Sequence, residues 1–221
     1  MKSKMKRKLI CIITIFPVTI ISIVVLILMF HNNKTTQIKL KLSSGDVSAK
    51  VVNEVNADEQ NYDLAPKTLD EVIRNEGASI FEGKVQKIRY MELKVDSCII
   101  PIAVLEVEVN DCIKGDLYPG ESVEILTHTN CSISKVADEA KVDSNAIFIA
   151  ITNDDGERNY FKSGDSKLVL KDIAKYSLPE GQRWLFVENG EDILYDNDFY
   201  VEMGKVNSLD EVKYWLKNCG E

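Results

Sequence analysis

The sequence predicts a mainly β domain of the α+β class, with short capping helices, preceded by a single transmembrane helix. Three observations support this prediction: a long apolar run near the amino terminus, several short segments in which apolar and polar residues alternate, and two helix-capping signatures. Alternation with a period of two is typical of strands with one buried face, whereas capping signatures mark the first turn of a helix.

The apolar run extends from Leu9 to Phe30. As a helix it would be roughly 33 Å long at about 1.5 Å per residue, enough to cross a hydrocarbon core of about 30 Å. A cleaved secretory signal is the alternative, although the run is longer than the apolar region of such signals. Five cationic residues precede the run: Lys2, Lys4, Lys6, Arg7 and Lys8. This charge predicts that the amino terminus stays in the cytoplasm.

The predicted organisation has four parts. They are a cytoplasmic tail over residues 1–8, a transmembrane helix over 9–30, an extracytoplasmic spacer over 31–63 and a β-rich ectodomain over 64–221. The ectodomain has the size of one ordinary domain. Within the polar spacer, the alternation of residues 38–42 could add an edge strand.

The charge of the chain is unevenly distributed. Residues 1–34 hold six of the 27 basic residues and none of the 35 acidic ones, so the rest of the chain carries a net charge of −14. Phosphate binding depends on clustered lysine and arginine, which makes nucleic acid an unsuitable partner for so acidic a domain. A solvated, soluble exterior is the simplest reading of this charge.

Both predicted helices begin with a capping box. The first box spans residues 68–71 and opens a short helix, and the second spans residues 208–211. In each box a hydroxyl caps an early backbone amide and a glutamate reaches back to the start of the helix. The second helix places Val212, Trp215 and Leu216 on one face.

The predicted strands are short and numerous. Alternation over residues 81–85 resumes over 91–95 after a predicted bulge at 87–89. The strand over 103–109 is predicted to pair with 123–127 as an antiparallel hairpin. The apolar run 146–151 is predicted to be a strand buried on both faces. Further strand-length segments are 160–161, 168–170, 184–187, 193–195 and 199–201, and together they suggest a barrel or a sandwich.

Several of these segments occur in a familiar order: a capped helix, ASIFEGKV at residues 78–85, LEVEV running into IKGD by residue 116, and IFIA at 147–150. From about residue 68 to 151 this order resembles bacterial extracytoplasmic OB-fold-like domains of unknown function. The resemblance implies a small OB-like β-barrel. The chain departs from the pattern at Ser79, where an acidic residue is frequent, and at Cys131, where small residues and glycine are usual.

Four cysteines lie in the predicted ectodomain, namely Cys98, Cys112, Cys131 and Cys219. An even number of cysteines outside the cytoplasm permits two disulfides, in any of three connectivities. If Cys112 and Cys131 end neighbouring strands, the expected bridges are Cys98–Cys131 and Cys112–Cys219.

No set of residues in the sequence identifies a catalytic, cofactor or metal site. A surface cysteine transpeptidase or hydrolase of sortase-like topology, using Cys131, is the enzymatic alternative, and such chemistry needs a thiolate with a nearby base. His128 is the candidate base, but three positions apart on a strand the two side chains would face opposite ways.

The leading hypothesis is a non-enzymatic domain, anchored in the cell membrane, that binds an extracytoplasmic protein or small-molecule ligand. Aromatic side chains could stack such a ligand on a barrel face, or could instead belong to the core. The candidates are Tyr160, Phe161, Trp184 and Tyr195.

Overall fold

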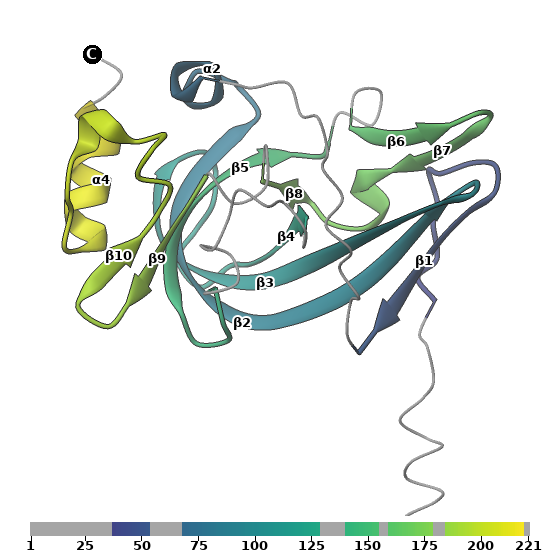
Figure 1. The fold of residues 1–221 in the computed structure, drawn as a ribbon, viewed down its shortest axis with the longest axis horizontal. Helices are drawn as coiled ribbons and strands as arrows, with labels where there is room; N and C mark the ends of the chain where they lie inside the picture. Colours follow the sequence, from purple (N-terminus) through teal and green to yellow (C-terminus); the bar gives the residue numbers. More distant parts are fainter. Residues whose placement is uncertain (1–36, 54–67, 129–139, 155–158, 179–183, 219–221) are drawn as a thin grey trace, which may run out of the picture. The chain divides into compact units, whose positions relative to one another are not determined.

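The structure is a computed structural model, and it describes residues 37–53, 68–128, 140–154, 159–178 and 184–218 (Figure 1). Its strands are β1 (Val47–Val52), β2 (Ala78–Val95), β3 (Cys98–Lys114), β4 (Ser122–His128), β5 (Asn145–Thr152), β6 (Tyr160–Ser163), β7 (Ser166–Val169), β8 (Tyr176–Ser177), β9 (Leu185–Asn189) and β10 (Asp192–Leu194). Its helices are α2 (Leu69–Ile73), η1 (Leu170–Asp172), η3 (Val201–Met203) and α4 (Leu209–Asn218).

The mainly β prediction is confirmed, because the α-helices within the described ranges are two short ones beside an eight-stranded and a two-stranded sheet. The same ranges contain no helix with the length and apolar character that a membrane crossing requires. The predicted tail over 1–8 and the predicted span over 9–30 lie outside the described residues.

A long hairpin of β2 and β3 dominates the sheet, and Figure 1 shows both strands strongly bent. The two strands pair from Val95 and Cys98 at the turn to Ile80 and Lys114 at the far end, with three shifts in register. One shift lies between Val85 and Lys87, at the edge of the predicted bulge. Such extra residues bend a strand and increase its twist.

The bend allows β2 to pair with two strands besides β1. Residues 78–84 of β2 pair with β5, while the other edge of the strand pairs with β3. β3 forms the predicted antiparallel hairpin with β4, and the short β8 pairs in parallel with β4 and antiparallel with β5. At Gly83, a Cβ atom would lie 2.5 Å from the Val107 side chain and 2.7 Å from the Glu108 carbonyl oxygen, so the close approach of β2 to β3 requires glycine.

Buried apolar side chains form three clusters. The first joins β2 to β5 and β9, and in it Phe81 stacks on Phe148 with ring centroids 5.4 Å apart. The second lies between the opposite face of β5 and α4, and includes Ile147 and Ile149. The third lies beneath β1 and β7. Because β5 contributes to the first two clusters, it is buried on both faces, as its apolar sequence predicts.

The sheet begins earlier than the predicted boundary at residue 64. β1 pairs with the second half of β2, and Gln37 forms a bridge with Lys50, so residues 37–53 belong to the folded unit. The predicted spacer over 31–63 therefore contains an ordered strand. This strand is β1, not the predicted edge strand over 38–42.

Residues 38–42 do not form the predicted edge strand because a carboxylate binds the backbone just before β1. Asp172 accepts hydrogen bonds from the backbone amides of Leu42 (2.8 Å) and Ser43 (2.9 Å) and from the Ser43 hydroxyl (2.7 Å). These amides therefore cannot pair with a strand. Burial raises the pKa of Asp172, but the hydrogen bonds from Ser43, Lys41 and Leu42 outweigh it and leave the pKa below its usual value.

The predicted strand at 199–201 is a turn followed by η3. The backbone amide of Phe199 donates to the Asp196 side chain at 3.0 Å, and the amide of Tyr200 donates to the Asp196 carbonyl at 3.0 Å. Local hydrogen bonds of this kind compete with strand pairing, and aspartate is well suited to make them.

Candidate functional site

The two capping boxes open helices that flank one pocket. The Glu71 amide donates to the Thr68 hydroxyl at 3.3 Å, and the Glu211 amide donates to the Ser208 hydroxyl at 3.3 Å. Both predicted caps are thus confirmed. Each cap is followed at once by a leucine that packs against the second cluster, which directs α2 and α4 toward the same part of the core.

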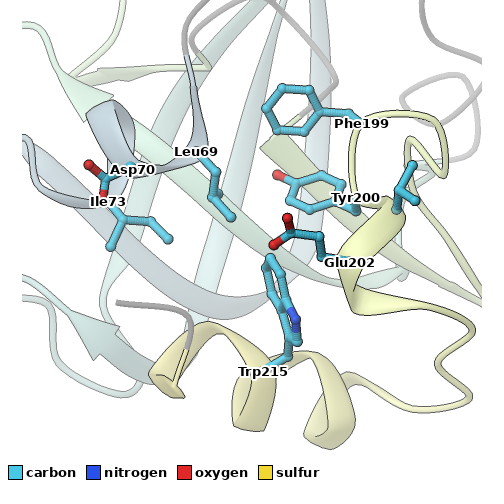
Figure 2. Close-up of a pocket in the computed structure, with 8 residues that line it drawn as sticks. Leu69, Asp70, Ile73, Phe199, Tyr200, Glu202 and Trp215 are labelled. Carbon is cyan, nitrogen blue, oxygen red and sulfur yellow. The ribbon is translucent and has the colours of Figure 1, made fainter. Parts of the chain in front are cut away.

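The pocket between α2, η3 and α4 has a volume of about 380 Å³ (Figure 2). We call it the aromatic–carboxylate pocket. Volumes of about 300–1,000 Å³ are typical of small-ligand sites. Its lining consists of Leu69, Asp70, Ile73, Phe199, Tyr200, Val201, Glu202 and Trp215.

Tyr200 is the centre of its aromatic wall. The side chain is only 2% exposed, and its ring centroid lies 4.9 Å from that of Phe199 and 5.9 Å from that of Trp215, both edge-to-face. Behind the wall, the ring of the fully buried Trp184 packs edge-to-face on that of Phe199, with 5.0 Å between the ring centroids. Edge-to-face pairs are favourable and hold each ring in one orientation, so the wall is preorganised.

Two carboxylates complete the pocket. Asp70 forms an ion pair with Arg74, the residue directly after α2, with 2.7 Å between Oδ1 and Nε. Glu202 is exposed, and no ion pair joins it to another described residue. Figure 2 shows its side chain on the same pocket as the rings of Tyr200 and Trp215, which pack edge-to-face on each other. The pocket therefore sets an anionic group beside aromatic surfaces.

Lys213 joins α4, which carries Trp215, to the sheet through ion pairs. Its ammonium lies 2.7 Å from Asp210 Oδ1, 2.7 Å from Glu82 Oε2 and 3.9 Å from Asp111 Oδ2. The hydrogen bonds with Asp210 and Glu82 outweigh desolvation and raise the pKa of Lys213 above its usual value. The Lys213 side chain is only 18% exposed, so this ion pair is better shielded than one at the open surface.

A second cavity, the hairpin groove, has a volume of about 390 Å³. It lies between the β2–β3 turn and β6, and is lined by Val95, Ser97, Cys98, Ile99, Ile100, Phe161, Lys162 and Ser163. Phe161 is one of the four aromatic residues proposed from the sequence as a stacking surface, and Cys98 is an exposed free thiol here.

The predicted disulfide cysteines are only partly within the described residues. Cys98 and Cys112 are free and lie near opposite ends of β3, 14 residues apart. At about 3.3 Å per residue along a strand they are far beyond the roughly 7 Å that a disulfide can span. Of the three connectivities, the one that joins these two cysteines is therefore excluded. Cys131 and Cys219 lie outside the described residues.

The two expected bridges remain predictions. Cys98 and Cys112 have no sulfur partner among the described residues, which do not include the expected partners Cys131 and Cys219. The enzymatic alternative depends on Cys131 and also stays a prediction.

The other aromatic residues proposed from the sequence do not line the aromatic–carboxylate pocket. Trp184 is fully buried behind it, Tyr195 donates its hydroxyl proton to the Gly204 carbonyl at 2.6 Å, and the Tyr160 ring lies 4.2 Å from the Lys167 ammonium. Sequence reasoning missed Phe199 and Tyr200 as site residues. The signal available for the pocket was the pair of capping boxes, together with Trp215 on the inner face of the second helix.

Within the described parts of the chain, no three side chains of histidine, cysteine, aspartate or glutamate are grouped as a metal site requires. Comparisons of the chain with protein-family models, with curated proteins and with solved structures give no match. The function therefore has to be argued from the sequence and the geometry alone.

Proposed function

We propose that this chain is a single-pass membrane protein whose OB-like domain binds a protein or small-molecule ligand outside the cytoplasm. The observation that carries the proposal is the aromatic–carboxylate pocket. Its walls come from three separate elements, its rings are fixed by mutual packing, and it opens to solvent beside the exposed Val201 and Glu202. Binding sites typically combine such an apolar surface with a few polar groups.

The strand pairings support the OB-like part of the proposal. β2 pairs with β3, β3 with β4, β4 with β8, β8 with β5, and β5 again with β2, so the pairings form a closed cycle of five strands. An OB-fold is a five-stranded, partly open Greek-key barrel. Apolar side chains of these strands form the first cluster, as expected for a small barrel filled by side chains.

Two glycines of the sequence resemblance lie where such a barrel needs them. Gly83 lies in β2 next to a shift in register, where β3 approaches closely. Gly115, in the IKGD segment, has a φ of +107°, and a Cβ atom there would lie 2.7 Å from the Ser79 hydroxyl. Glycine tolerates both constraints because it has no side chain.

The membrane anchor and the orientation rest on the basic residues and the apolar run of the first thirty positions. Because Gln37 already bridges to Lys50 of β1, six positions, 31–36, separate the proposed span from the described part of the folded unit. The net charge of −14 after residue 34 supports a partner other than nucleic acid.

Photo-crosslinking of the full-length chain in intact cells tests the proposal. Val201 lines the pocket and is 72% exposed, and Tyr118, in the β3–β4 connection, is also 72% exposed. With p-benzoylphenylalanine at Val201, irradiation is expected to give an adduct that mass spectrometry detects as a ligand or partner. The same replacement at Tyr118 is expected to give none. Absence of an adduct at Val201, or equal adducts at both positions, would contradict the proposal.

A further inference from the structure

We propose that the aromatic–carboxylate pocket recognises a lysine or arginine side chain carried by a partner protein. The cationic end would lie beside Glu202, and its aliphatic stem would lie against Leu69 and Trp215. This inference rests on the proposed function and specifies the chemistry of its ligand.

The first argument is that the exposed Glu202 and the partly exposed Trp215 line the same pocket (Figure 2). The face of an aromatic ring carries partial negative charge, so a carboxylate near Trp215 gains nothing from that ring. A cation placed in the pocket interacts favourably with both the carboxylate and an aromatic ring. The wall and the acidic group therefore favour the same ligand charge.

The second argument is the apolar remainder of the lining. Leu69, Ile73 and Trp215 are partly exposed and form the side of the pocket away from η3. Lysine and arginine combine a charged end with an aliphatic stem that packs on apolar surfaces. A pocket of about 380 Å³ has room for such a side chain.

The third argument is the charge of the surrounding chain. Residues 184–218 contain eight aspartates and glutamates but only three lysines. One of the three, Lys213, already contacts Glu82 and Asp210. Two further cations lie near the pocket, Arg74 beside Asp70 and Lys114 at the Ile73 and Asn75 carbonyls. Acidic residues still outnumber basic ones in this part of the chain, which favours a basic partner segment over a phosphate or carboxylate ligand.

The test uses the indole N–H signals of the full-length protein in detergent micelles. The chain has two tryptophans, Trp184 and Trp215, so a ¹⁵N-labelled sample gives two indole signals that also report on folding. The probes are the peptide acetyl-Ala-Lys-Leu-amide and the same peptide with the uncharged norleucine in place of lysine. We expect the lysine peptide to shift the Trp215 signal in a saturable manner, and the norleucine peptide to bind roughly tenfold more weakly or not at all.

Glu202→Gln removes the negative charge but keeps the shape of the side chain. It is expected to lower the affinity for the lysine peptide roughly tenfold. Glu191→Gln makes the same charge change at an exposed turn outside the pocket and should leave the affinity within about twofold. The lysine peptide is also compared with free n-butylammonium, because stronger binding of the free amine would point to a small-molecule ligand and overturn the protein-partner assignment.

The inference would be overturned if the lysine and norleucine peptides bound equally well. It would also be overturned if Glu202→Gln and Glu191→Gln lost the same affinity for the lysine peptide. If crosslinking from Val201 succeeds while neither the lysine charge of the peptide nor the Glu202 carboxylate affects binding, the pocket binds a ligand of another class. If crosslinking also fails, the proposed function itself is wrong.

Discussion

The Asp172 carboxylate binds the residues just before β1, next to the backbone bridge between Ser44 and Lys167. Its hydrogen bonds to Leu42 and Ser43 span about 130 positions of sequence. The Ser43 hydroxyl in turn accepts a hydrogen bond from the Val169 amide at 2.9 Å. These contacts fix the position from which β1 enters the sheet.

Asp172→Ala is expected to lower the free energy of unfolding by roughly 1–3 kcal/mol, because it leaves backbone amides without their acceptor. Urea denaturation of the full-length protein in micelles measures this loss. Asp165→Ala, at an exposed turn of the β6–β7 hairpin, is the matched control and should change stability by less than about 0.5 kcal/mol. Similar losses in both variants would contradict the assigned role.

The lowered pKa of Asp172 also predicts a pH dependence. The ionised carboxylate stabilises the folded state at every pH above its unfolded pKa of about 3.9. This contribution is lost as the pH falls below that value and through the lower pKa of the folded state. Between pH 7 and pH 3, the wild type should therefore lose more stability than Asp172→Ala, and an equal loss would argue against the ionised contact.

At the residue scale, the sequence predicted local contacts and missed distant ones. The Thr68 and Ser208 caps follow from spacings of three residues, so the sequence alone predicted them. The Asp172–Ser43 contact could not be predicted, because its partners meet only where Ser44 bridges Lys167 of β7, which is far away in the sequence.

Among the elements, α4 depends most on one side chain. Lys213 is largely buried and joins the helix to Glu82 on β2. Removing the lysine would leave the Glu82 carboxylate partly buried without its cation, which is costly.

Lys213→Met is expected to keep the aliphatic packing, lose roughly 1–2 kcal/mol of stability and disturb the aromatic–carboxylate pocket. Thermal unfolding measures the first effect, and the Trp215 indole signal reports the second. Lys217→Met, at the exposed end of the same helix, is the control and should leave both nearly unchanged. An unaltered Trp215 signal in Lys213→Met would show that the ion pairs do not position the helix.

At the element scale, periodicity predicted β3, β4, β5 and both helices, because each has a clear apolar face or a cap. It misplaced the first strand of the sheet, because residues 38–42 alternate as clearly as residues 47–52. The two segments differ in structure because the Leu42 amide binds Asp172, a contact that periodicity does not reveal. The turn at Asp196 was also missed, because Phe199 and Tyr200 have the aromatic character typical of strands.

For the molecule as a whole, the arrangement of the pocket depends on pairings that local sequence does not encode. A bent β2 that pairs with both β3 and β5 brings α2, which precedes it, toward the face of β5 that α4 covers. The sequence predicted that both helices exist, but not that they share a pocket.

We propose that the folded domain lies on the outer side of a membrane. Labelling with a membrane-impermeant maleimide tests this claim most directly, in full-length variants that carry Tyr118→Cys or Ser3→Cys, with the unsubstituted chain as background. Tyr118 is 72% exposed, and Ser3 lies in the predicted cytoplasmic tail. We predict that intact cells label the Tyr118→Cys variant above background, whereas the Ser3→Cys variant is labelled only after the membrane is permeabilised. Labelling of Ser3→Cys in intact cells, with Tyr118→Cys protected, would contradict the account.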